Sequence, residues 1–413
     1  MKLPLKFAQI LQVLPFFDST VDRWAIEARM LRLLIFLWIF AGLAVLFSAS
    51  YPEADLLRND GWHYFKQQLL WVLIGLLMFN GIVHLPLRTT MKLGTVGLFI
   101  TLAMLYFTYI TGTKVNDATR WIALGPVLIQ PSELIKPFLV LQAAQLFGHW
   151  QRTSWQKRLG WLAVFLLALA GILMQPSLSV TALCGITLWM MALGAGLPSW
   201  QMIGSALLGV GAAVSSVAFR DYQRRRVMSF LDPWPVQAGD GYQLVQSLLA
   251  VGSGGLGGAG FGLSQQKMFL PIQYTDFIFA IFAEEFGFVG SIALILLVMI
   301  FGTLGLRIAA KCKDPVVRLV ALGSTVLIVM QSFLNIGVAT GVLPTTGLPF
   351  PFMSYGGNAM LASLAVAAFL IRAAREMSSA EVIAFPRKFD SSSHTDGDKS
   401  MVKSTRLHRA REF

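Results

Sequence analysis

One acid and a group of cations stand out in the segment 220–276, which separates two long apolar runs. Asp276 ends this segment and directly precedes the apolar run 277–306. A carboxylate can act as a general base toward a hydroxyl group, and guanidinium groups bind phosphate oxygens in a bidentate way. The pattern predicts an anion site for a phosphate-bearing substrate, with Asp276 as base and the nearby cations as ligands: Arg220, Arg224, Arg225 and Arg226.

Both features also have ordinary structural explanations. Arginines on a long solvated loop need no ligand. An acid before an apolar helix can be its N-cap, accepting backbone N–H bonds. The N-cap interpretation of Asp276 is compatible with catalysis, because a helix N-terminus lowers the pKa of an acid whereas burial raises it.

Further charged residues lie inside or beside the apolar runs. Glu133 and Lys136 are three residues apart on one helix face. They can form a mutual pair, or Lys136 can present its charge to a substrate in a groove. Lys114 and Arg120 lie in an outer loop beside Trp121, where Arg120 can bind phosphate or anchor the loop at the membrane interface.

Two more acids, Glu284 and Glu285, lie inside the apolar run after Asp276. Carboxylates are costly inside a membrane, so we expect both to be paired or neutral. Structural pairing within the helix bundle is at least as well supported as a chemical role. We therefore assign them as supporting residues.

Two glycine-rich stretches differ in what they predict. The run 252–257 matches the spacing of a dinucleotide-binding loop, but no strand precedes it, so we reject that function and expect a hinge near the membrane. The stretch 341–357 contains three prolines and predicts a broken, re-entrant segment that walls a cavity.

Composition indicates which class of structure holds these residues in place. The chain has 413 residues, of which 55% are hydrophobic and only 13% charged, and apolar runs of about 20 residues recur along it. We predict an all-α, polytopic integral membrane protein. Its ten transmembrane helices are expected at 30–50, 66–85, 92–111, 133–148, 158–175, 178–197, 199–219, 277–306, 316–340 and 359–374.

The basic residues predict the orientation. Ten spans place both termini on one side, and most of the 33 lysines and arginines fall in the terminal segments and the connections on that side. The positive-inside rule makes this side cytoplasmic. The net charge of +12 therefore indicates topology, and we expect no nucleic-acid partner. We divide the chain into a cytoplasmic segment (1–29), a membrane domain (30–375) with a large extracytoplasmic loop (220–276), and a disordered basic cytoplasmic tail (376–413).

Several motifs occur together in one order along the chain, and with them it resembles the SEDS family (shape, elongation, division and sporulation proteins). Any one motif is weak, but the ordered set is specific and covers nearly the whole membrane region. The motifs are Thr119-Arg120-Trp121, 130–136 (QPSELIK), 222–226 (YQRRR) with 232–234 (DPW), 241–247 (GYQLVQS), 275–280 (TDFIFA), 343–349 (LPTTGLP) and 354–357 (SYGG).

The resemblance implies a bacterial peptidoglycan glycosyltransferase that polymerises lipid II at the outer face of the cytoplasmic membrane. It implies a class B penicillin-binding protein and other divisome proteins as partners, and allows a divalent cation, Mg²⁺ or Mn²⁺, as cofactor. Asp276 matches the essential acid, while Arg120, Lys136 and Glu133 match cavity positions. Thr275 and Gln243 lie in matched motifs and are assigned supporting roles. The terminal extensions resemble the division-type members more than the elongation-type members, which implies a location at the septum.

Three positions depart from the family pattern. Ser177 replaces an acid that is usual between the fifth and sixth spans, so no role of that acid carries over. Tyr274 replaces a usual histidine and Asn358 a usual serine. A histidine base next to Asp276 is therefore excluded.

Two other functions also fit the sequence. Buried acids in a ten-span protein also suit a lipid II flippase or permease. A non-catalytic divisome scaffold would use the tails and the loop 220–276 as partner sites. For the polymerase we expect an inverting transfer in which Asp276 deprotonates the acceptor hydroxyl.

Overall fold

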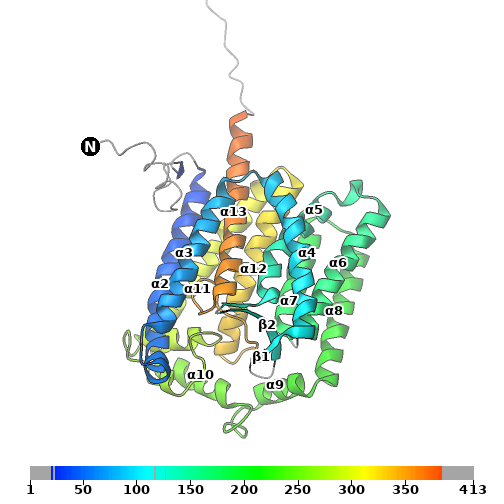
Figure 1. The fold of residues 1–413 in the computed structure, drawn as a ribbon. Helices are drawn as coiled ribbons and strands as arrows, with labels where there is room; N and C mark the ends of the chain where they lie inside the picture. The colour runs from blue at the N-terminus through cyan, green and yellow to red at the C-terminus, as the bar shows by residue number, and fades with distance from the viewer. Residues whose placement is uncertain (1–19, 22–23, 116–117, 126, 176, 384–413) are drawn as a thin grey trace, which may run out of the picture.

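The computed structural model describes residues 20–21, 24–115, 118–125, 127–175 and 177–383. Residues 1–19 and 384–413, which make up most of the two predicted terminal segments, lie outside the described residues. Ten long helices build the described part (Figure 1). They are α2 (Ile26–Arg58), α3 (His63–His84), α4 (Leu87–Thr111), α5 (Pro131–Gly148), α6 (Trp155–Met174), α7 (Leu178–Gly194), α8 (Ser199–Phe219), α11 (Ile278–Lys311), α12 (Pro315–Ala339) and α13 (Gly357–Ile383).

These helices confirm the prediction of an all-α, multi-pass membrane protein. In the described residues, eight of them are long and apolar enough to cross a membrane. The other two are shorter: α7 is an apolar helix of 17 residues, and the 18-residue α5 carries Glu133, Lys136 and an internal proline. Helices satisfy all backbone hydrogen bonds internally, which lipid requires. Helix α13 continues to Ile383, several residues past the expected start of the tail.

The helix ends define two faces of the bundle. The start of α2 and the end of α13 lie together at the upper end in Figure 1. The opposite end, called the loop end below, carries the segments 112–130, 220–277 and 340–356 (Figure 1). The common location of the start of α2 and the end of α13 agrees with ten crossings. That the loop end is extracytoplasmic stays a prediction from the basic residues.

The connections at the loop end are more ordered than the sequence indicated. The segment 220–276 contains helices α9 (Asp221–Leu231) and α10 (Tyr242–Ser253) and the short 3-10 helix η4 (Gln266–Met268). Between α4 and α5 the chain forms a three-stranded antiparallel sheet, β1 (Thr113–Val115), β2 (Ala118–Leu124) and β3 (Val127–Ile129). This small sheet is the part of the described fold that departs from an all-α architecture.

The core lies around α12 and α13, whose side chains are mostly buried, whereas α8 lies at the edge and exposes most of its apolar surface (Figure 1). The segment 340–356 enters this core from the loop end. Phe350 and Phe352 pack against Trp38 of α2, with ring centroids 5.9 and 5.3 Å apart. Trp38 is about 30 Å from the end of α2 at the loop end, Arg58, at 1.5 Å per residue. The prediction of a re-entrant segment is therefore confirmed.

Helix α11 is broken close to its start. Gly287 has a left-handed backbone conformation (φ 66°) inside the helix. The glycine-rich stretch 254–260 packs against this break, and the N–H groups of Ala259 and Gly260 donate to the carbonyls of Glu284 and Glu285 at 2.9 and 3.0 Å. Backbone N–H groups of this stretch thus satisfy helix carbonyls at the break. Glycine allows the two backbones to approach closely enough for these bonds.

Candidate active site

Asp276 lies in the turn that precedes α11. The helix begins at Ile278, its N-cap is Phe277, and no side chain caps it. The N-cap interpretation of Asp276 is therefore wrong. Other segments hold the backbone here: the Asn335 amide donates to the Asp276 carbonyl at 2.7 Å, and the Ser354 hydroxyl donates to the Thr275 carbonyl at 2.5 Å. The turn is fixed from α12 and from the re-entrant segment.

The electrostatics of Asp276 balance burial against two cations. Burial raises the pKa of the Asp276 carboxyl above its ordinary value, and the positive charges of Arg226 and then Arg120 oppose that rise. Thr275 also interacts with the carboxylate and lowers its pKa. Within the described part of the chain, the carboxylate has no cation within 4.0 Å. Among the described residues, Asp276 is thus an acid with cations nearby and no direct ion pair.

The two cations come from different connections at the loop end. Arg226 of α9 donates to the Thr345 carbonyl at 3.1 Å and lies over the Tyr222 ring, 4.5 Å from its centroid. Arg120 of β2 donates through Nε to the Gln175 carbonyl at 2.9 Å. Burial lowers the pKa of Arg120, and Tyr222 and Asp276 oppose this effect. The charges of Arg120 and Arg226 therefore both act on Asp276, and their contribution to substrate binding stays a prediction.

Among the described side chains, Arg224 and Arg225 do not join this cluster. Arg224 forms an exposed ion pair with Asp221 at 3.0 Å, and Arg225 is exposed on the same helix. Lys114 lies on β1 opposite Thr119, and its side chain is outside the described residues. Gln243 lies partly exposed in the first turn of α10. Their predicted contributions to substrate binding or support stay predictions.

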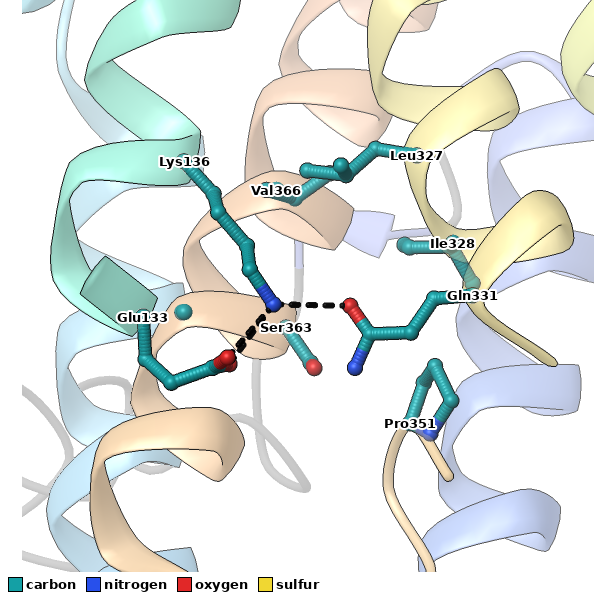
Figure 2. A pocket seen from close by; sticks show the side chains of 9 residues that line it. Glu133, Lys136, Leu327, Ile328, Gln331, Pro351, Ser363 and Val366 are labelled. Atoms are coloured by element: carbon teal, nitrogen blue, oxygen red, sulfur yellow. Dashed lines mark hydrogen bonds and ion pairs between the residues drawn. The ribbon is translucent and has the colours of Figure 1, made fainter. Parts of the chain in front are cut away.

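Glu133 and Lys136 form a closed pair inside the bundle. The Lys136 ammonium contacts both carboxylate oxygens of Glu133, at 2.7 and 2.8 Å, and donates to Gln331 Oε1 at 3.1 Å (Figure 2). Each charged side chain is only 2–3% exposed. These contacts use the three donors of the ammonium group. The mutual pair inferred from spacing is present, and a direct contact of Lys136 with substrate stays a prediction.

A cavity of about 10 Å³ lies against this pair. Glu133, Lys136 and Gln331 line it together with Pro351 of the re-entrant segment and Ser363 of α13 (Figure 2). This volume is near the lower limit for one water molecule. The cavity is thus too small for a sugar.

Glu284 and Glu285 bind the glycine-rich connection. Glu284 accepts hydrogen bonds from the Ser264 hydroxyl and from the backbone N–H groups of Gln265 and Gln266, the latter two at 2.9 and 3.3 Å. Glu285 accepts from the Ser48 hydroxyl and lies 4.0 Å from the Lys267 ammonium. Both acids are buried and hold segments together, in agreement with a supporting role.

Sequence reasoning missed two polar residues of α12, Gln331 and Asn335. Gln331 Nε2 donates to the Pro349 carbonyl at 2.8 Å, and Asn335 Nδ2 donates to the Leu348 carbonyl at 2.8 Å in addition to Asp276. Their signal was available, because two amides spaced by four residues in an apolar span are costly unless they bind something.

The departures from the family pattern also have structural counterparts. Tyr274 stacks on Tyr64 with centroids 4.7 Å apart, contacts Tyr355 edge-on, and donates to Glu53 at 3.0 Å. Burial raises the pKa of Tyr274, so its hydroxyl stays protonated. Burial likewise raises the pKa of Tyr355 to about 12. Tyr274 is therefore a packing residue beside Asp276.

Ser177 and Asn358 lie farther along the walls of this region. Ser177 is buried directly before α7, close in sequence to the Gln175 carbonyl that binds Arg120. Asn358 donates to the Leu128 carbonyl at 2.8 Å and so joins the start of α13 to β3.

A divalent cation would find few protein ligands here. In the residues that the structure describes, no three His, Cys, Asp or Glu side chains lie together. Mg²⁺ commonly uses one or two carboxylates and completes its shell with waters and substrate phosphates. Asp276 fits that limited protein contribution.

Comparison with known proteins supplies the family. The model of the FtsW, RodA and SpoVE family, described as "Cell cycle protein", matches residues 28–379. This protein belongs to that family. The match includes every candidate site residue discussed above.

Curated relatives extend the match over nearly full length. A protein of Synechocystis sp. named "Probable peptidoglycan glycosyltransferase FtsW" is 54% identical over 379 residues, which are 91% of this chain and 96% of the relative. A protein of Saccharophagus degradans with the same name is 36% identical over 82% of this chain and 90% of the relative.

Solved structures show the same fold at lower identity. A chain from work described as "Structural coordination of polymerization and crosslinking by a peptidoglycan synthase complex" superposes with a TM-score of 0.68 and 26% identity, over 84% of this chain and 97% of the other. The rod shape determining protein RodA of Thermus thermophilus superposes with a TM-score of 0.62 and 26% identity, over 84% and 96%.

Proposed function

We propose that this protein is a peptidoglycan glycosyltransferase that polymerises lipid II into glycan strands at the outer face of the cytoplasmic membrane. The observation that carries the proposal is Asp276, a partly accessible acid on which the charges of Arg226 and Arg120 act. The names of the curated relatives support the same activity.

The position of that acid supports the following reaction. Asp276 takes the proton from the C4 hydroxyl of the acceptor sugar while that oxygen bonds to the anomeric carbon of the donor. The bond from the anomeric carbon to the phosphate oxygen breaks, and undecaprenyl diphosphate leaves with the electron pair. Attack opposite the leaving group inverts the anomeric centre. General-base catalysis of this kind contributes about 10²- to 10⁴-fold.

Arg120 and Arg226 supply the charge that the leaving diphosphate needs. Cations held in place before the reaction stabilise developing negative charge without reorganisation. Arg226 is held by Thr345 and Tyr222, and Arg120 by the Gln175 carbonyl. Lys136 is linked to the re-entrant segment through Gln331, which donates to the Pro349 carbonyl.

A divalent cation, Mg²⁺ or Mn²⁺, is the proposed cofactor. Asp276 would hold it together with diphosphate oxygens, and the ion would neutralise part of the diphosphate charge. Loss of activity on chelation, restored by Mg²⁺ or Mn²⁺ and not by a monovalent salt, tests this role.

The proposed setting is the division septum of a bacterial cytoplasmic membrane. A class B penicillin-binding protein would crosslink the new strands, together with other divisome proteins. The likeness to a chain of a peptidoglycan synthase complex supports such a partnership. An elongation-type role would instead require activity with an elongation-type transpeptidase and none with the division-type enzyme.

A polymerisation assay on purified lipid II tests the function. We expect wild-type protein to make glycan strands and Asp276→Asn to lose at least about 100-fold in rate. Asp221→Asn is a matched control, because Asp221 is an exposed acid on α9 paired with Arg224. Retained turnover in Asp276→Asn would refute the base assignment.

Reconstituted vesicles separate the polymerase from the flippase alternative. Polymer formed from outward-facing substrate without translocation favours the enzyme, and translocation without polymer favours the flippase. Three buried acids motivated the flippase. Glu284 and Glu285 are bound to the connection 264–267 and to Ser48, and Glu133 is paired with Lys136. A scaffold would function normally without Asp276.

A further inference from the structure

Two amide side chains on one face of α12 connect the re-entrant segment to the Glu133–Lys136 pair and to the turn at Asp276. Gln331 and Asn335 are four residues apart and therefore lie on the same helix face. Gln331 bridges the Lys136 ammonium and the Pro349 carbonyl, and Asn335 bridges the carbonyls of Leu348 and Asp276. Both side chains are buried, with Asn335 only 1% exposed.

The contacts fix the orientation of each amide. Asn335 Nδ2 faces two carbonyl oxygens at 2.7 and 2.8 Å, so rotating the amide would place oxygen against oxygen. Gln331 accepts from an ammonium through its oxygen and donates to a carbonyl through its nitrogen. Rotating this amide would therefore also break both hydrogen bonds. Each amide can therefore hold its partners in one arrangement only.

The segment that these amides hold also lies beside the Asp276 carboxylate and binds Arg226. A Cβ placed on Gly347 would lie 3.3 Å from Asp276 Oδ2, and the Thr345 carbonyl accepts from Arg226. The amides thus bind at positions 348 and 349, next to the residues that border the reacting groups. A shift of this segment would move the carboxylate and the arginine relative to each other.

We propose that Gln331 and Asn335 are positioning residues of the glycosyl transfer, holding the segment 345–349 and the Asp276 backbone in one register against α12. The proposal rests on the proposed polymerase function. Neither amide touches substrate in this role. Asn335 sets the place of the base, and Gln331 joins the Glu133–Lys136 pair to the same segment.

Kinetics of lipid II polymerisation test the proposal. We expect Asn335→Asp, which keeps the size but removes the donor, to lower kcat about 10- to 100-fold, leave KM within about twofold, and displace the acid limb of the pH–rate profile. A misplacement of about 1 Å can cost this much in rate. Gln331→Glu keeps an acceptor for Lys136 but loses the donor to Pro349, and we expect a fall of about tenfold that Gln331→Leu exceeds.

Ser332→Ala is the matched control. Ser332 is fully buried between the two amides, and its hydroxyl donates only within the helix, to the Ile328 carbonyl at 2.8 Å. We expect wild-type kcat and pH profile. Wild-type kcat and pH profile in Asn335→Asp and Gln331→Glu as well would overturn the proposal while leaving the polymerase function intact.

A second measurement does not depend on activity. Asp276→Cys is labelled with a membrane-impermeant maleimide, with and without Asn335→Asp, and protein containing only the native Cys184 and Cys312 gives the background. We expect Asn335→Asp to change the labelling rate at least severalfold, and an unchanged rate contradicts the positioning role. If wild-type protein makes no polymer, the proposed function fails, and the labelling rates still decide whether Asn335 positions residue 276.

Discussion

The charge of Glu133 acts on Asp276, yet the surroundings of the two acids differ. Glu133 is in direct contact with a lysine and almost fully buried. Asp276 is partly accessible, and its arginines act from beyond ion-pair distance within the described residues. A buried pair mainly compensates its own desolvation. The comparison indicates that Lys136 occupies the carboxylate of Glu133, whereas the carboxylate of Asp276 is open to a ligand.

The largest expected effect tests whether the Glu133–Lys136 pair is structural. Lys136→Met leaves the Glu133 carboxylate buried without its cation and should lower the free energy of unfolding by about 3–5 kcal/mol. Denaturant unfolding in detergent measures this loss. The double variant Glu133→Gln with Lys136→Met should recover most of it. Unchanged stability with a raised KM for lipid II would instead make Lys136 a substrate ligand.

The next effect concerns the charge next to Asp276. Arg226→Gln should lower the polymerisation rate about 100-fold, because it removes one preorganised cation from the leaving diphosphate. Arg226 is also the stronger of the two charges that lower the pKa of Asp276. The pKa should therefore rise in the variant, and the acid limb of the pH–rate profile should move to higher pH. Arg225→Gln, an exposed neighbour, is the control and should leave the limb in place.

A third effect concerns the glycine beside the carboxylate. Gly347 has a φ of +72°, and an added Cβ would contact Asp276 Oδ2, so Gly347→Ala combines backbone strain with displacement of the base. We expect about a tenfold loss of rate, since such strain costs about 1–3 kcal/mol. Gly196→Ala matches the strain, with φ +75° and open space around it. Equal losses in the two variants would mean that strain alone acts.

The smallest effect should come from the exposed face of α9. Arg224 pairs with Asp221 at the surface, and exposed pairs contribute about 0.2–1 kcal/mol. Arg224→Gln should therefore change the polymerisation rate by less than about twofold in the same assay. A loss as large as that of Arg226→Gln would extend the anion site onto the outer face of this helix.

The sequence predicted what depends on local spacing. Apolar runs placed the ten long helices, and the interval of three residues placed Glu133 beside Lys136. That Arg120 and Arg226 act on Asp276 was a hypothesis, because the separation of residues along the sequence does not give their distance in space. Their common segment 220–276 linked Arg226 to Asp276 in that hypothesis, and the family resemblance added Arg120.

Other features depended on tertiary contacts that local patterns do not contain. The N-cap interpretation of Asp276 failed because Asn335 and Ser354 hold the preceding turn, so that α11 starts at Ile278 without a side-chain cap. The glycine run 252–257 was expected to be a hinge. Its role against the break at Gly287 depends on a second segment, which the run itself does not encode.

That break has a consequence for how the protein fits its membrane. Unbroken, α11 would measure about 51 Å, far more than the roughly 30 Å hydrocarbon layer. The portion 288–311 alone measures about 36 Å and can cross with a modest tilt. A thicker or thinner bilayer can therefore be accommodated by leaning of this portion, while the piece 278–286 remains attached to the glycine connection. We therefore expect the depth of Asp276 in the membrane to depend little on lipid composition.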